Sequence, residues 1–248
     1  MVQSPPRQAP PRRDRRKDRG AVGFLRDLVV IVVVAVLASF LIKTFLIRSF
    51  FIPSESMENT LQVHDRILVN ELVPGLIPLQ RGDVIVFKDP DTWLAGQADY
   101  APEPSGPLQA SAEWVLSIFG LSAQDANDHL VKRVIGLPGD RVSCCNALGQ
   151  LSVNGTPVQE PYVVKQQGSD RVSEQDFDVK VPAGELWVMG DNRYNSEDSR
   201  YHPTTEHKGF VPLDDVVGRA FVVSWPISHW AWLSNYPGSF AGVGPPGS

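Results

Sequence analysis

The stretch Leu130–Leu137, LVKRVIGL, decides the fold class of this 248-residue chain. It is short and rich in Val, Ile and Leu, and the turn signal Pro138-Gly139-Asp140 follows it, as is typical of a β-strand. Similar runs are RILVNEL (66–72), DVIVF (83–87), QLSVNGTPV (150–158), ELWVMG (185–190) and VVGRAFVVSW (216–225). Because no helical segments alternate with them, we expect a mainly β fold, an antiparallel β-sheet or barrel-like domain.

A long apolar segment precedes these strands. The run Leu28–Ile42 contains no charged residue, and its apolar character continues past Lys43 to Ile47. As a helix, residues 28–47 match a hydrocarbon core of roughly 30 Å. The preceding residues 1–27 hold eight basic and three acidic residues. Under the positive-inside rule this excess favours a disordered cytoplasmic tail and one transmembrane α-helix, rather than a nucleic-acid-binding arm.

Two other interpretations of the apolar segment are weaker. Val36-Leu37-Ala38 is a small-x-small sequence of the kind that signal-peptide cleavage requires, but Phe40-Leu41-Ile42 keeps the segment apolar beyond it. A buried helix of a soluble protein is disfavoured because the segment has no polar face. We therefore expect an extracytoplasmic domain (48–233) with an insertion (89–128), followed by a Gly/Pro-rich tail (234–248).

Three features leave alternatives open. Within the insertion, Glu113–Leu121 has the composition of a short helix that either lies on the membrane or packs on the domain. Trp225–Leu233, with three tryptophans, either contacts the membrane interface or packs against the sheet. The adjacent Cys144 and Cys145 form either a vicinal disulfide or free or intermolecular thiols.

Reactive and charged residues are concentrated in three tracts, PSESM (53–57), VKRVIGLPGD (131–140) and GDNRYNSEDSR (190–200). A serine becomes a nucleophile only where a base takes its proton, and none of the five histidines lies in a recognisable Ser-His-Asp context. Lys132 is the alternative base, provided that burial in its apolar strand lowers its pKa from about 10.4 toward 7 to 8. A solvent-facing lysine on an edge strand is the alternative that the residues alone leave open.

Five blocks in this order resemble those of the bacterial type I signal peptidases, which remove signal peptides with a Ser/Lys dyad: PSESM, GDVIVF, KRVIGLPGD, GDNRYNSEDSR and GRAF. The resemblance spans the anchor and nearly all of the chain from Phe50 to Phe221. It implies a single-pass enzyme of the bacterial cell membrane that cleaves exported preproteins after small-x-small (Ala-x-Ala) sites. Asn59 departs from the proline that the family commonly has, which removes no catalytic atom.

The resemblance also assigns roles to individual residues. It implies that Ser56 is the nucleophile and Lys132 the general base, while the Ser56 N–H and the Ser54 hydroxyl form the oxyanion hole. Ser196 would orient the Lys132 amine. Supporting ion pairs would join Arg133 to Asp191 and Arg200 to Asp198. The substrate would bind as an added strand, and its small side chains would enter shallow apolar pockets lined by Phe50, Ile52, Pro53, Met57, Leu61, Ile67, Leu130 and Val131.

We expect no cofactor and no metal. No cluster in the sequence has metal-ligand spacing, and Gly242–Gly247, which matches G-x-G-x-x-G, follows no strand. The expected partners are signal-peptide-bearing preproteins and the lipid bilayer, without nucleic acid, and we expect a monomer near the secretion translocon. Two alternatives are a Ser/Lys peptidase with a narrower client, such as a pilin precursor, and an inactive membrane-tethered binding module.

Overall fold

The computed structural model describes residues 16–94, 129–166 and 168–246; side chains of residues 16–22 and 38–45 lie outside that description. The chain divides into two compact units, Met1–Ile42 and Lys43–Ser248. The predicted short helix at 113–121 lies outside the described residues.

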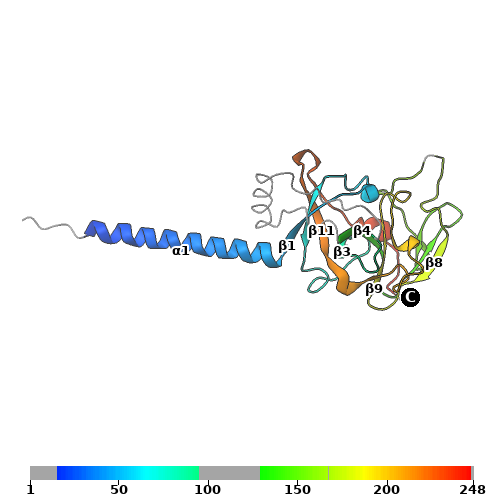
Figure 1. Cartoon of the computed structure of the whole chain (residues 1–248), viewed down its shortest axis with the longest axis horizontal. Helices are drawn as coiled ribbons and strands as arrows, with labels where there is room; N and C mark the ends of the chain where they lie inside the picture. The colour runs from blue at the N-terminus through cyan, green and yellow to red at the C-terminus, as the bar shows by residue number, and fades with distance from the viewer. Residues whose placement is uncertain (1–15, 95–128, 167, 247–248) are drawn as a thin grey trace, which may run out of the picture. The chain divides into compact units, whose positions relative to one another are not determined.

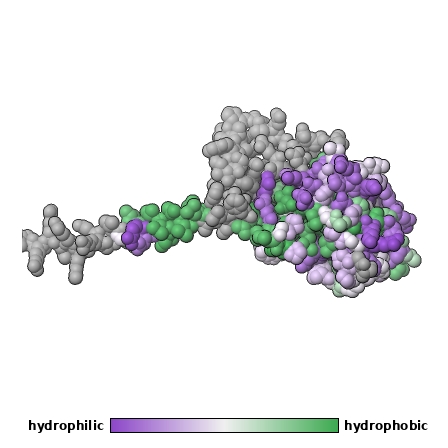
Figure 2. Space-filling model, turned by 90° about the horizontal axis from the view of Figure 1, so that it is seen from below, coloured by the Kyte–Doolittle hydropathy of each residue, from purple (hydrophilic) through white to green (hydrophobic). Residues whose placement is uncertain are grey.

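The helix α1 spans Arg16–Phe45 (Figure 1). It begins inside the basic segment that we predicted to be a disordered tail. Its described apolar side chains, from Phe24 to Leu37, are exposed and form the green stretch of the helix in Figure 2. Among the described residues, no helix has the length and hydropathy that crossing a membrane requires. The predicted span, 28–47, includes residues whose side chains lie outside the description.

The second unit is built from two antiparallel sheets, which confirms the predicted mainly antiparallel β fold. Among the described strands, the larger sheet has the order β1-β2-β11-β3-β4-β9-β10, with β12 also paired to β11, and the smaller has the order β7-β6-β5-β8. The strands are β1 (Ile47–Phe51), β2 (Arg66–Asn70), β3 (Val84–Lys88), β4 (His129–Gly136), β5 (Arg141–Cys144), β6 (Ser152–Val153), β7 (Thr156–Pro157), β8 (Phe177–Lys180), β9 (Glu185–Met189), β10 (Val211–Pro212), β11 (Val216–Trp225) and β12 (Ala231–Trp232).

Short 3₁₀ turns connect several of these strands. They are η1 (Glu55–Met57), η3 (Ser199–Tyr201), η4 (Leu213–Asp215), η5 (Ile227–His229) and η6 (Pro237–Phe240). The first two of these turns carry residues of the tracts in which the sequence concentrates its reactive side chains.

Strand β4 lies inside the larger sheet, with β3 and β9 along its two edges, and most of its side chains on both faces are buried. Its register pairs Ile85 with Lys132 on one side and Arg133 with Met189 on the other. Val134 belongs to one hydrophobic cluster and Ile135 to another, as expected for successive side chains that point to opposite faces of a sheet. The strand therefore carries two charged side chains, Lys132 and Arg133, into the interior.

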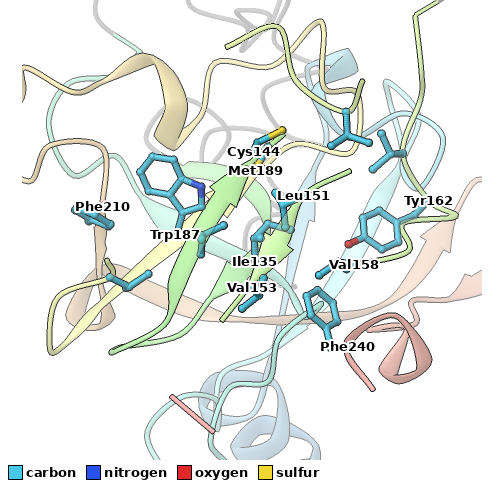
Figure 3. Packing of buried hydrophobic residues seen from close by; sticks show 14 residues of the cluster. Ile135, Cys144, Leu151, Val153, Val158, Tyr162, Trp187, Met189, Phe210 and Phe240 are labelled. Carbon is cyan, nitrogen blue, oxygen red and sulfur yellow. The ribbon is translucent and has the colours of Figure 1, made fainter. Parts of the chain in front are cut away.

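The C-terminal segment is packed on the domain instead of forming the tail that its Gly/Pro content predicts. Phe240, in η6, is 8% exposed and joins the cluster that contains Val158 and Tyr162 (Figure 3). The backbone carbonyl of Ser234 accepts a hydrogen bond from Arg133 at 3.1 Å. Burial of the Phe240 side chain thus holds the segment on the domain, although the surrounding glycines and prolines suggest a flexible tail.

Cys144 and Cys145 form a disulfide at the end of β5, so the vicinal alternative is the one observed. Cys144 lies in the cluster of Figure 3. The backbone N–H of Cys145 donates to the Asp176 carboxylate at 3.2 Å. The disulfide therefore adjoins the segment that leads into β8.

The tryptophan-rich segment after β11 presents its large side chains to solvent. Trp225, Ile227, Trp230 and Trp232 are all more than half exposed, and the rings of Trp230 and Trp232 meet edge to face at 5.6 Å. The segment nevertheless packs against the sheet, because β12 pairs with β11 and the Trp232 ring stacks on that of Phe221 at 6.1 Å. Contact with the membrane interface stays a prediction, and the four side chains named above remain more than half exposed. They form an exposed aromatic surface of the second unit.

Candidate active site

The loop after β1 positions Ser54 and Ser56. Ser56 lies in η1, and the extended Ser54 precedes that turn. The loop folds back on itself because the Ile52 N–H donates to the Asp65 carbonyl and the Ile52 carbonyl accepts from the His64 N–H, both at 2.9 Å. From a distant part of the chain, the Asn192 N–H donates to the Ser56 carbonyl at 3.1 Å. These bonds fix the backbone on both sides of Ser56.

Strand β4 brings the Lys132 amine to Ser56. The Nζ atom donates to the Ser56 Oγ at 2.8 Å, and the Lys132 residue is only 3% exposed. The Oγ atom of Ser54 lies 3.2 Å from that of Ser56. Once the amine is neutral, this geometry allows it to accept the Ser56 proton.

Burial lowers the pKa of Lys132 to about 8, because the charged amine loses its water on entering the sheet. Asp198 opposes this change by favouring the charged form, and Arg200 supports it. A measurable fraction of the amine is therefore neutral near pH 7. The interpretation of Lys132 as a solvent-facing lysine on an edge strand is wrong, since β4 has a partner on each side.

Both predicted ion pairs are present and fully buried. Arg133 donates to the Asp191 carboxylate at 2.8 and 2.6 Å, and Arg200 contacts the Asp198 carboxylate through Nε and Nη2, each at 2.8 Å. Burial opposes the ionisation of Asp198, but the Arg200 charge outweighs it and holds the pKa of that carboxyl below its usual value. Asp198 is thus a fixed negative charge near the Lys132 amine.

Ser196 lies beside the dyad but makes a different contact from the one predicted. Its hydroxyl donates to Asp198 Oδ2 at 2.8 Å, and the hydrogen bonds of the described residues include none between Ser196 and Lys132. The carboxylate attracts the hydroxyl more strongly than an amine that is already donating to Ser56. A Cβ atom at Gly190 would lie 2.2 Å from the Ser196 Oγ and 2.5 Å from the Ser56 carbonyl oxygen, so only glycine allows this approach.

Residues 25–225 match the model of the family described as signal peptidase, peptidase S26. The chain belongs to this family. A probable signal peptidase I of Mycobacterium leprae is 38% identical over 234 residues, covering 85% of this chain and 80% of that protein. The signal peptidase I of Leptolyngbya laminosa is 32% identical over 234 residues, covering 94% and 96%. A crystal structure of a signal peptidase I from Enterococcus faecalis has 26% identity and a TM-score of 0.35, covering 57% of this chain and 95% of that one.

Membership of the signal peptidase family confirms the resemblance drawn from the five sequence blocks. It also confirms the expectation of a type I signal peptidase, a serine protease. Family membership does not test the roles predicted for single residues. The evidence for those roles is the geometry around Ser56.

In this signal peptidase, Ser56 and Lys132 line a cleft of about 730 Å³. Six predicted site residues line it: Pro53, Ser54, Ser56, Leu130, Lys132 and Ser196. Among the lining residues that the sequence did not single out are three carboxylates, Glu55, Glu174 and Glu197. Glu55 and Glu197 lie within the recognised blocks and could have been found there. Glu174 comes from a segment without a motif, and only the fold brings it to the cleft.

The other predicted pocket residues do not line this cleft. Phe50, Ile52, Met57, Leu61 and Ile67 are at most 4% exposed and pack in one hydrophobic cluster, against which Val131 is partly buried. Their side chains fill the space beside β1 and β2, because apolar residues on adjacent strands gain more by packing together than by facing an open cleft. Of the eight predicted residues, only Pro53 and Leu130 remain in the lining.

Proposed function

We propose that this signal peptidase is a membrane-anchored serine endopeptidase that removes N-terminal signal peptides from exported preproteins, using Ser56 as nucleophile and Lys132 as general base. The observation that carries the proposal is the buried 2.8 Å contact between Lys132 Nζ and Ser56 Oγ. Burial that lowers the pKa of the amine to about 8 supports the same assignment.

In the first half of the reaction, neutral Lys132 takes the proton of Ser56 as Oγ attacks the scissile carbonyl. The Ser56 N–H and the Ser54 hydroxyl donate to the oxygen that becomes negative. Protonated Lys132 then gives its proton to the leaving amine, and the mature protein departs. In the second half, Lys132 takes a proton from water, the hydroxide attacks the acyl ester, and Ser56 recovers the proton as the signal peptide leaves.

Cleavage after small-x-small sites is part of the proposal. Pro53 and Leu130 supply apolar surface next to the dyad, and the close-packed cluster that contains Ile52 and Met57 leaves little room beside them. A substrate strand that lies along the cleft would meet this surface with its small side chains.

The test is cleavage of a detergent-solubilised preprotein that bears an Ala-x-Ala site by the purified full-length protein. We expect one cut, after the second alanine, which mass spectrometry of the products locates. A preprotein with leucine in place of that alanine should remain uncut. If the folded protein processes only a pilin-type precursor, the narrower client replaces the general one; if it cleaves neither, the proposal fails.

We further propose that α1 anchors the protein, with the N-terminus in the cytoplasm and the catalytic unit outside. The uncharged run Leu28–Ile42 and the excess of basic residues before it support this orientation. The exposed aromatic surface, Trp225, Ile227, Trp230 and Trp232, suits contact with the membrane interface, where tryptophan side chains are enriched.

Protease added to intact cells should therefore digest the residues after Ile47 and spare a short N-terminal fragment. Mass spectrometry of the fragment left in the membrane gives the boundary. The matched control is the same digestion after the cells are opened, which should also remove residues 1–27. Protection of the whole chain in intact cells would refute the orientation.

A further inference from the structure

The Arg200 guanidinium is held by three different partners. Nε and Nη2 bind Asp198, Nη2 also donates to the Arg193 carbonyl at 2.8 Å, and Nη1 donates to the Ser173 hydroxyl at 3.2 Å. Asp198 and Arg193 belong to the same segment as Arg200. Ser173, by contrast, lies just before β8, a strand of the smaller sheet. The Ser173 hydroxyl thus connects the segment that leads into the smaller sheet with the Arg200–Asp198 ion pair beside Lys132.

The Ser173 hydroxyl is positioned to accept the hydrogen bond from Arg200. The residue is fully buried, and its hydroxyl donates its proton to the Gln175 carbonyl at 2.9 Å, which leaves the oxygen lone pairs for Arg200. The Ser173 carbonyl accepts from Arg171 Nε at 3.2 Å, and Arg171 is itself paired with Asp176. Asp176 also accepts from the backbone next to the disulfide. These contacts fix the place of the hydroxyl independently of Arg200.

We propose that Ser173 is a positioning residue of the catalytic site, which holds the Arg200 guanidinium against Asp198 so that the Asp198 charge beside Lys132 stays neutralised. The proposal rests on the proposed role of Lys132 as the base. None of the five sequence blocks contains Ser173, and the resemblance drawn from them assigns it no role.

The charges around Lys132 determine whether its pKa rises or falls when the Ser173 hydroxyl is removed. Those that act on its amine are Asp198, Asp191 and Glu197, which favour the charged form, and Arg200, which opposes it. Asp191 is also paired with Arg133 on β4, while Glu55 and Glu174 line the same cleft. Without the Ser173 hydroxyl, Arg200 loses its Nη1 partner and holds Asp198 less closely. The negative charge then acts more strongly on the amine, and the pKa of Lys132 rises.

The test is the pH profile of kcat/KM for Ser173→Ala between about pH 6 and pH 10, with the preprotein substrate described above. We expect the rising limb to move to higher pH by about half a unit, so that kcat/KM falls about threefold at pH 7 and rejoins the parent value near pH 9.5. An equal loss at every pH, or no change at any pH, would overturn the proposal, because a merely structural residue does not move the limb.

Two variants separate positioning from stability. Val172→Ala truncates a buried side chain of the same segment and leaves the hydroxyl in place, so it should lower the melting temperature without moving the limb. Ser173→Thr retains the hydroxyl and should keep the parent limb. If Ser173→Ala is too unstable to assay, a displaced limb in Ser173→Thr, or in Val172→Ala, counts against the proposal.

A second measurement distinguishes failure of this proposal from failure of the proposed function. In the Ser56→Ala background, the ε-carbon resonance of Lys132 in ¹³C-lysine-labelled protein reports its titration without any activity. A higher titration midpoint after Ser173→Ala supports the positioning role even if the substrate proves to be another preprotein. An unchanged midpoint refutes it even if cleavage proceeds as proposed.

Discussion

Ser56→Ala abolishes cleavage of the Ala-x-Ala preprotein, with kcat/KM reduced by about 10,000-fold or more, as is usual when a catalytic nucleophile is removed. The variant should still fold and bind substrate, because the change removes only the Oγ atom that Lys132 contacts. The measurement is single-turnover cleavage at saturating enzyme, together with near-ultraviolet circular dichroism to show that the fold is intact.

The neighbouring serine provides a graded comparison. Ser54→Ala should lower kcat by about 100- to 1,000-fold with little change in KM, the usual cost of losing one oxyanion donor. Ser152→Ala, on strand β6 of the smaller sheet, is the matched control and should retain full activity. Residual cleavage by Ser56→Ala above a tenth of the parent rate would assign the nucleophile to another residue.

Lys132→Met should lower kcat/KM by a factor similar to that of Ser56→Ala, but for a different reason. Methionine fills the same space but cannot accept a proton, so Ser56 stays protonated and unreactive. Because a buried amine costs free energy that a thioether does not, we expect the melting temperature of this variant to equal or exceed that of the parent. Activity lost without loss of stability would identify the lysine as catalytic; activity and stability lost together would identify it as structural.

The pH profile of the parent enzyme tests the same residue. Only neutral Lys132 can act as base, so kcat/KM should rise about tenfold per pH unit below the pKa and level off above it. The midpoint should lie near the lowered pKa of about 8. Lys180→Met, which changes an exposed lysine on β8, is the control and should leave the profile unchanged. A profile that is already flat below pH 7 would exclude Lys132 as the base.

The sequence predicts the strands whose apolar pattern and flanking turns are both strong. The runs that include Arg66–Asn70, Glu185–Met189 and Val216–Trp225 contain β2, β9 and β11, and Asn154-Gly155, both with positive φ, forms the turn between β6 and β7. Strand β1 was missed because its first residue, Ile47, is also the last residue of the apolar segment. Strand β8 was missed because its Asp and Lys alternate with half-buried residues at the edge of a small sheet.

Prediction of the site from the sequence is limited because residues that meet in the structure lie far apart along the chain. The residues next to Lys132 in the sequence do not determine whether the lysine is buried or exposed. Its burial depends on the position of β4 inside the sheet, between β3 and β9. Likewise, Glu174 and Ser173 carry no signal of a site in the sequence, because the cleft that Glu174 lines and the Arg200 guanidinium that Ser173 contacts are formed by residues far away along the chain. The ion pairs of Arg133 and Arg200 could be anticipated, since each arginine and its acidic partner lie in recognised blocks.

The register of β3 against β4 has a consequence for the connection between the two strands. Ile85 faces Lys132 in a hairpin whose ends, Lys88 and His129, are joined by residues 89–128. The entropy of closing such a connection grows only with the logarithm of its length, so doubling or halving it changes the free energy of folding by about 0.6 kcal/mol. Beyond Leu94, which lines the cleft, a change in the length of the chain between β3 and β4 should therefore leave the strand pairing, and with it the position of Lys132, in place.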